Sequence, residues 1–78
     1  MEYDPDRIDD AVLALGYLTL HDGVRVWKSF DWDALSRLHA KGLISDPVSK
    51  AKSVVLTEQG LQEAERLCNE LFGKAPSK

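Results

Sequence analysis

The run over residues 30–60, FDWDALSRLHAKGLISDPVSKAKSVVLTEQG, constrains the fold most because its start and stop signals occur in a fixed order. Asp31 is suited to cap the N-terminus of a helix, and Gly42 is suited to end it, so the pattern predicts a helix over 32–41. Two aliphatic pairs separated by a polar, proline-containing loop then predict a β-hairpin over 43–56. The chain therefore has to place a hairpin directly after a short helix.

The last helix is predicted over 58–72. Thr57 supplies its N-cap, and Gly73 ends the apolar periodicity. Residues at intervals of three and four give this helix one apolar stripe. The stripe consists of Leu61, Ala64, Cys68 and Leu71.

The first helix is predicted over 5–20, with Asp4 as N-cap and Pro5 at the first helical position. Helical spacing places apolar residues on two of its faces, which predicts cover on two sides. The first face carries Ile8, Val12, Leu15 and either Leu18 or Thr19, and the second carries Leu13, Tyr17 and Leu20. A partner subunit is one way to cover the second side.

Residues 24–30 are expected to be extended or strand-like, because Val24, Val26 and Trp27 have strand propensity. The order helix, extended segment, helix, hairpin, helix predicts an α+β, mainly α, winged-helix-like domain with three main helices and a β-hairpin wing. A chain of 78 residues makes one such domain, over 1–73, and 74–78 are expected to form a disordered tail.

Two resemblances support this fold. The turn Leu35-Ser36-Arg37-Leu38 … Lys41-Gly42-Leu43-Ile44 and the helix entry Leu56-Thr57-Glu58-Gln59-Gly60 resemble the wing region of bacterial winged-helix regulators of the MarR and PadR type. The chain as a whole, especially LTLHDG, FDWDALxRLHxKGLISDPV and KAKSVVLT, is similar to the small bacterial DUF6429 family, a domain of unknown function. The first resemblance implies DNA binding; the second implies no particular activity.

Charge argues against a simple DNA reader. The net charge is −3, and Asp31 and Asp33 stand at the start of the helix that would approach phosphates. The basic residues of the chain can be interpreted as a local contact surface for nucleic acid or a protein partner. The favoured interpretation is that they form an ordinary solvated surface. The candidate residues of the contact surface are Arg25, Lys28, Trp32, Arg37, Lys41, Lys50 and Lys52.

Three aromatic residues cluster within six positions. Trp27 and Phe30 are expected in the core. For Trp32 two interpretations are open, namely packing within the domain and an exposed anchor for a protein partner.

No catalytic residue, cofactor or metal is predicted. His21, Asp22, His39 and Cys68 lack the spacing of a metal site, Cys68 lies on an apolar stripe, and Asp9-Asp10 are expected on an exposed helix face. The sequence offers no transmembrane stretch and no signal core, so a cytoplasmic location is expected.

The favoured function is a non-catalytic interaction module that forms a homodimer through its first and last helices, with a further protein partner also open. The alternative is a DNA-binding transcriptional regulator that uses helix 32–41 and a wing with Lys50 and Lys52.

Overall fold

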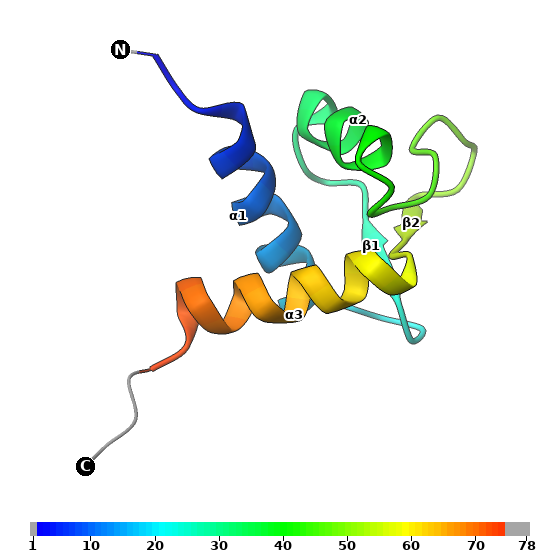
Figure 1. The fold of residues 1–78 in the computed structure, drawn as a ribbon. Coiled ribbons are helices and arrows are strands. Elements are labelled where there is room, and N and C mark those ends of the chain that lie inside the picture. Colours follow the sequence, from blue (N-terminus) through cyan, green and yellow to red (C-terminus); the bar gives the residue numbers. More distant parts are fainter. Residues whose placement is uncertain (1, 75–78) are drawn as a thin grey trace.

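The computed structural model describes residues 2–74. Its elements follow the order α1 (Pro5–Leu18), β1 (Arg25–Trp27), α2 (Trp32–Ala40), β2 (Ser53–Val55) and α3 (Glu58–Phe72) (Figure 1). Three helices and a two-stranded antiparallel sheet confirm the prediction of an α+β, mainly α fold. The helix bounds agree with the sequence except that α1 ends two residues early and α2 ends one residue early. Residues 75–78, most of the predicted tail, lie outside the described residues.

Each helix begins at the capping residue that the sequence indicated. The side chains of Asp4, Asp31 and Thr57 accept hydrogen bonds from backbone N–H groups in the first turns of α1, α2 and α3, at 3.0, 3.1 and 2.9 Å. These bonds satisfy donors that a helix cannot satisfy internally. The helix starts are therefore set by local chemistry.

Gly42 ends α2 as predicted. Its backbone is left-handed, with φ of 77°. Its N–H bonds to the carbonyl of His39 at 2.9 Å, and the N–H of Leu43 bonds to the carbonyl of Leu38 at 3.0 Å. This pair of bonds is the Schellman motif, which closes a helix and turns the chain sharply away.

The sheet differs from the expected hairpin. β1 pairs with β2 in a register that places Val26 opposite Val54, so the segment 24–30 does contain a strand. The predicted hairpin over 43–56 is reduced to one bridge between Ile44 and Leu56. The hydroxyl of Ser45 accepts the N–H of Val55 at 2.9 Å, where a longer ladder would use a backbone carbonyl.

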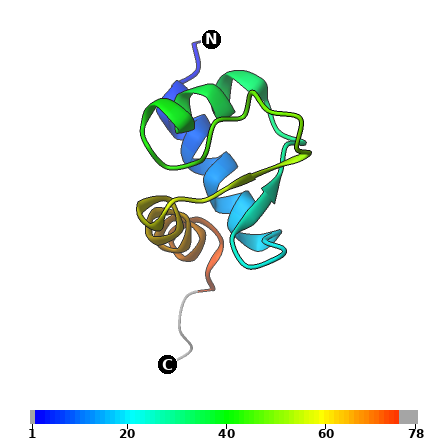
Figure 2. The same ribbon diagram turned by 90° about the vertical axis from the view of Figure 1, so that its right-hand side faces the viewer.

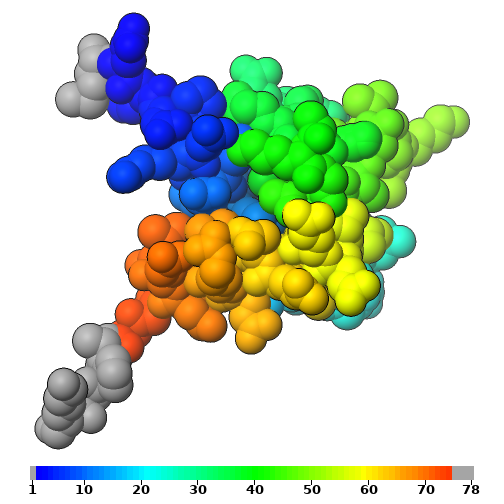
Figure 3. Space-filling view, in the orientation of Figure 1, coloured from blue at the N-terminus to red at the C-terminus, as the bar shows by residue number. Residues whose placement is uncertain are grey.

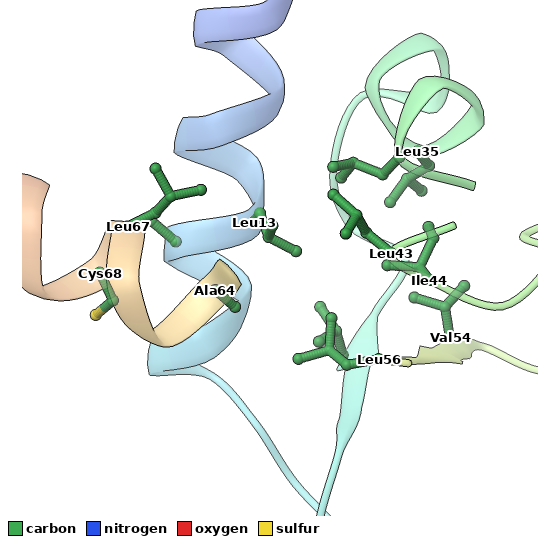
Figure 4. Close-up of a cluster of buried hydrophobic side chains, with 12 residues drawn as sticks. Leu13, Leu35, Leu43, Ile44, Val54, Leu56, Ala64, Leu67 and Cys68 are labelled. Atoms are coloured by element: carbon green, nitrogen blue, oxygen red, sulfur yellow. The ribbon is translucent and has the colours of Figure 1, made fainter. Parts of the chain in front are cut away.

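The core lies between α1, α3, α2 and the sheet (Figure 4). Ala64, Leu67 and Cys68 of α3 are buried in the core cluster together with Leu13 of α1. Most of the apolar stripe on α3 is thus used inside the monomer, and only Leu71 of its predicted members is exposed. The two helices cross, with the sheet at one end of the molecule (Figures 1 and 2).

Trp27 corrects a sequence prediction, because it is 48% exposed and not part of the core. Side chains alternate along a strand, and Val26 takes the inward position, so Trp27 must point outward. Phe30 is partly buried and packs against the core, as expected.

Candidate functional site

Three side chains form an ion cluster between α1 and α2. The carboxylate of Asp9 accepts hydrogen bonds from Nε of Arg37 at 2.9 Å, and Nη2 of Arg37 lies 2.8 Å from it. Nζ of Lys41 lies 3.0 Å from Asp9 and 3.0 Å from the exposed carboxylate of Asp6. The cluster joins the first half of α1 to the last turns of α2.

The Asp9 side chain is fully buried, which corrects the expectation of an exposed Asp9-Asp10 face. Burial raises the pKa of Asp9, but hydrogen bonds from Arg37 and Lys41 together with their charges outweigh it, so the pKa lies below its ordinary value. The hydrogen bond to Asp9 likewise raises the pKa of Arg37 and of Lys41. All three groups are therefore charged at neutral pH.

This pairing divides the predicted basic surface. Arg37 and Lys41 face α1 and neutralise acids there, so neither side chain is free to hold a phosphate. Arg25 and Lys28 lie instead at the sheet, and Lys50 and Lys52 are exposed in the loop that precedes β2. Two of the seven predicted contact residues, Arg37 and Lys41, are therefore held in the ion cluster.

The sheet brings the remaining cations together. Nη1 of Arg25 donates to the hydroxyl of Ser53 at 3.1 Å. Nζ of Lys28 donates to the carbonyl and the hydroxyl of Ser49 at 3.0 and 3.1 Å. The backbone N–H of Lys28 bonds to the carbonyl of Lys52 at 3.0 Å. The residues Arg25, Trp27, Lys28, Lys50 and Lys52 are called the sheet patch below.

Two tryptophans are exposed near this patch. The ring of Trp27 stacks on His21, with centroids 3.9 Å apart and planes 13° from parallel. Trp32 begins α2, is 53% exposed and has the ammonium of Lys28 at 5.8 Å from its ring centroid. The anchor interpretation of Trp32 agrees with its exposure.

A second surface lies on α1 and the end of α3. Ile8, Leu15 and Leu18 recur at helical spacing and are 40, 43 and 60% exposed. Leu71 and Phe72 of α3 are also exposed, at 52 and 46%. We call these five residues the α1–α3 apolar face. An open groove between α1 and α3 has Ala11 of α1 and Leu71 of α3 in its lining.

Of the two predicted apolar faces of α1, one packs in the core and the other is largely exposed. Leu13 is buried, and Tyr17 and Leu20 pack against the core. The face with Ile8, Leu15 and Leu18 is open, and only Val12 of that set contacts the core.

Sequence reasoning missed Asp9, although a signal was present. Asp9 precedes Leu13 by one helical turn and so shares its core-facing side. An acid on the apolar side of a helix requires a cationic partner, and Arg37 and Lys41, one turn apart, supply two.

Within residues 2–74, no three His, Cys, Asp or Glu side chains are grouped so that they could hold a metal ion. Cys68 is a buried free thiol in the core. No helix of the described chain is long and apolar enough to span a membrane.

These features define a small α+β domain with one buried ion cluster and two distinct exposed surfaces. The chain belongs to the DUF6429 family, described as a domain of unknown function, whose model matches residues 4–74. It is 58% identical over 72 residues to "Uncharacterized protein y4hR" of Sinorhizobium fredii (strain NBRC 101917 / NGR234), a match that covers 92% of this chain and 97% of that relative. No solved structure matches the chain significantly.

Proposed function

We propose that this protein is a non-catalytic interaction module that pairs with a second copy of itself through the α1–α3 apolar face. The exposure of Ile8, Leu15 and Leu18 on one side of α1 carries this proposal. The buried residues of α1 are Asp9, Leu13, Ala14 and Gly16, and Ile8, Leu15 and Leu18 are left on the part of the helix that the core does not cover. A helix that is apolar on its solvent side as well as its core side is typical of an interface.

Charges beside the face suit a twofold contact. Arg7, Asp10 and Glu70 line the groove between α1 and α3. In a contact with twofold symmetry each surface meets its own copy, so Arg7 of one protomer can approach the acids of the other. Such complementary charges favour a second copy over an unrelated apolar partner.

The apolar area is sufficient for a weak to moderate dimer. Burying a large aliphatic or aromatic side chain completely contributes about 1.5–3 kcal/mol, and five half-exposed ones on each of two copies contribute about 10 kcal/mol. The loss of rigid-body freedom costs at least about 4 kcal/mol. The difference corresponds to a dissociation constant of roughly tens of micromolar.

Sedimentation equilibrium from micromolar to millimolar protein tests the proposal. We expect a monomer–dimer equilibrium for the wild type and a monomer for Leu15→Lys, which places a charge in the centre of the face. Gln62→Lys, at an exposed position of α3 outside the face, is the matched control and should dimerise normally. Circular dichroism verifies that both variants fold. A wild type that stays monomeric at millimolar concentration refutes the dimer.

The DNA-binding alternative has weaker support. The resemblance to MarR- and PadR-type regulators would place α2 in the major groove with Lys50 and Lys52 on the wing. Arg37 of α2 and Lys41 at its C-cap are paired with acids, and Asp33 is exposed at the start of α2. If the alternative holds, a Lys50→Glu/Lys52→Glu variant loses a low-salt gel shift of duplex DNA that the wild type gives.

A further inference from the structure

Charge is strongly segregated in this chain. The segments 24–30 and 48–56, which contain β1, β2 and most of the preceding loop, carry Arg25, Lys28, Lys50 and Lys52 and no acid. Since the net charge of the whole chain is −3, the rest of the chain carries −3 − 4 = −7. These two segments are therefore basic although the protein is acidic.

The four cations are not neutralised by neighbours. The ion pairs of residues 2–74 within 4.0 Å involve only Arg37, Lys41 and Arg66 as cations. The loop that precedes β2 and carries Lys50 and Lys52 lies at the side of the molecule away from the N-terminus of α1 (Figure 3). Screening at physiological salt acts over about 8 Å, so the local charge governs what approaches the patch.

Trp27 adds a flat apolar surface among these cations. His21 covers one face of the indole, and the stack holds the ring in a fixed orientation. The exposed 48% of the residue therefore lies on its other face and its edges. Ser53, which binds Arg25, is the cross-strand partner of Trp27, so a cation and the ring are neighbours on the outer side of the sheet.

We propose that the sheet patch binds single-stranded nucleic acid. The phosphates contact Arg25, Lys28, Lys50 and Lys52, and one base stacks on the free face of Trp27. Basic side chains along a path combined with an exposed aromatic ring are the two features that non-specific single-strand binding requires. An acidic protein segment would use the cations equally well but would gain nothing from the flat ring.

The proposed site differs from the DNA-reading surface considered above. It uses the outer side of the sheet and the loop, and α2 takes no part. A two-stranded sheet with three residues in each strand is about 10 Å long, which suits a few nucleotides better than a duplex groove. It shares no residue with the α1–α3 apolar face, so its test does not depend on dimer formation.

Fluorescence anisotropy of a labelled oligothymidylate tests the proposal, with two probes as comparisons. An abasic oligomer presents the same phosphates without bases, and polyglutamate presents carboxylates on a peptide. We expect oligothymidylate to bind at least about tenfold more tightly than either probe, because stacking adds to charge. Four phosphate contacts predict that log K falls with log salt with a slope of about −3.

Matched variants assign the site. Trp27→Leu should weaken oligothymidylate binding about tenfold and leave abasic binding unchanged, whereas Trp32→Leu should leave both unchanged. Lys50→Glu should weaken binding about tenfold, and Lys74→Glu, with the same change of charge at the end of α3, should not.

Equal affinity for the abasic oligomer or for polyglutamate would overturn the proposal, as would no detectable binding at low salt. Equal effects of Lys50→Glu and Lys74→Glu would also overturn it, because they would show attraction to the protein as a whole.

Discussion

Replacing Asp9 with asparagine removes the charge at the centre of the ion cluster while keeping the shape of the side chain. In the wild type the carboxylate is fully buried and receives donors from Arg37 and Lys41 at 2.8–3.0 Å. In Asp9→Asn one oxygen acceptor becomes an amide donor that faces other donors. The variant should therefore loosen the contact between α1 and α2.

The magnitude follows from the exposure of the partners. Removing one member of a buried ion pair costs about 3–5 kcal/mol when the other charge is left buried and unpaired. Here the buried charge itself is removed, and the side chains of Arg37 and Lys41 are 34 and 37% exposed, so water can solvate them. We expect Asp9→Asn to lower the free energy of unfolding by about 2 kcal/mol. The whole free energy of unfolding of a domain of this length is roughly 4–12 kcal/mol. A loss of about 2 kcal/mol should therefore lower the melting temperature by about 10 °C.

Urea denaturation followed by circular dichroism measures the difference in free energy of unfolding between the wild type and Asp9→Asn. The dependence of this difference on pH identifies the carboxylate as its cause. The pKa of Asp9 is lowered in the folded state, so its stabilisation is fully present above its ordinary value of 3.8 and is lost as pH falls through the lower folded value. The difference between wild type and Asp9→Asn should be constant near neutral pH and shrink below pH 3.8.

Asp10→Asn is the matched control, with the same substitution one residue along the helix at a side chain that forms no ion pair within residues 2–74. It should change the free energy of unfolding by less than about 0.5 kcal/mol. If Asp9→Asn and Asp10→Asn have equal effects, or if the Asp9 difference persists unchanged in strong acid, the ion cluster does not stabilise the fold as argued.

Substitutions at three further positions test how α3 and α2 are joined. A Cβ at Gly60 would lie 1.8 Å from the carbonyl oxygen of Leu43, so Gly60→Ala should lower the free energy of unfolding by about 3 kcal/mol, despite a gain in helix propensity of about 1 kcal/mol, in urea titrations. At Gly42 a Cβ meets nothing within 4 Å, and Gly42→Ala should lose only about 1–2 kcal/mol, the cost of its positive φ. The hydroxyl of Thr57 caps Gly60 and donates to the carbonyl of Gly42 at 2.8 Å, so thermal melts should show a loss of about 1–2 kcal/mol for Thr57→Val and little for Thr57→Ser.

The helix starts and the end of α2 could be predicted from the sequence because their causes lie within a few residues. Asp4, Asp31 and Thr57 each bond to a backbone N–H two or three positions ahead, and Gly42 closes α2 through its own backbone. Such contacts do not depend on the rest of the fold, so the pattern alone identifies them.

Pairing between distant segments could not be predicted in the same way. The aliphatic residues at Leu43-Ile44 and Val54-Val55 predict strands but not their partners, and the pairing of β2 with β1 joins residues almost thirty positions apart. Trp27 was assigned to the core by its size, although strand alternation beside Val26 directs it outward. The prediction of the contact residues suffered most from unpredicted contacts between distant segments. Asp9 forms ion pairs with Arg37 and Lys41, which the sequence pattern assigns to a basic surface.

The two proposed surfaces share no residue, and a dimer would link them in a measurable way. A dimer formed through the α1–α3 apolar face carries two sheet patches, so one dimer offers two equivalent sites for single strands. A strand long enough to reach both sites should bind more tightly than a short one, because the second contact is then intramolecular. Leu15→Lys should abolish this gain with length and leave the affinity for the short strand unchanged, since it alters the dimer and not the sheet patch. Loss of short-strand affinity in Leu15→Lys would instead show that each sheet patch needs the partner subunit, and the two surfaces would then form a single site.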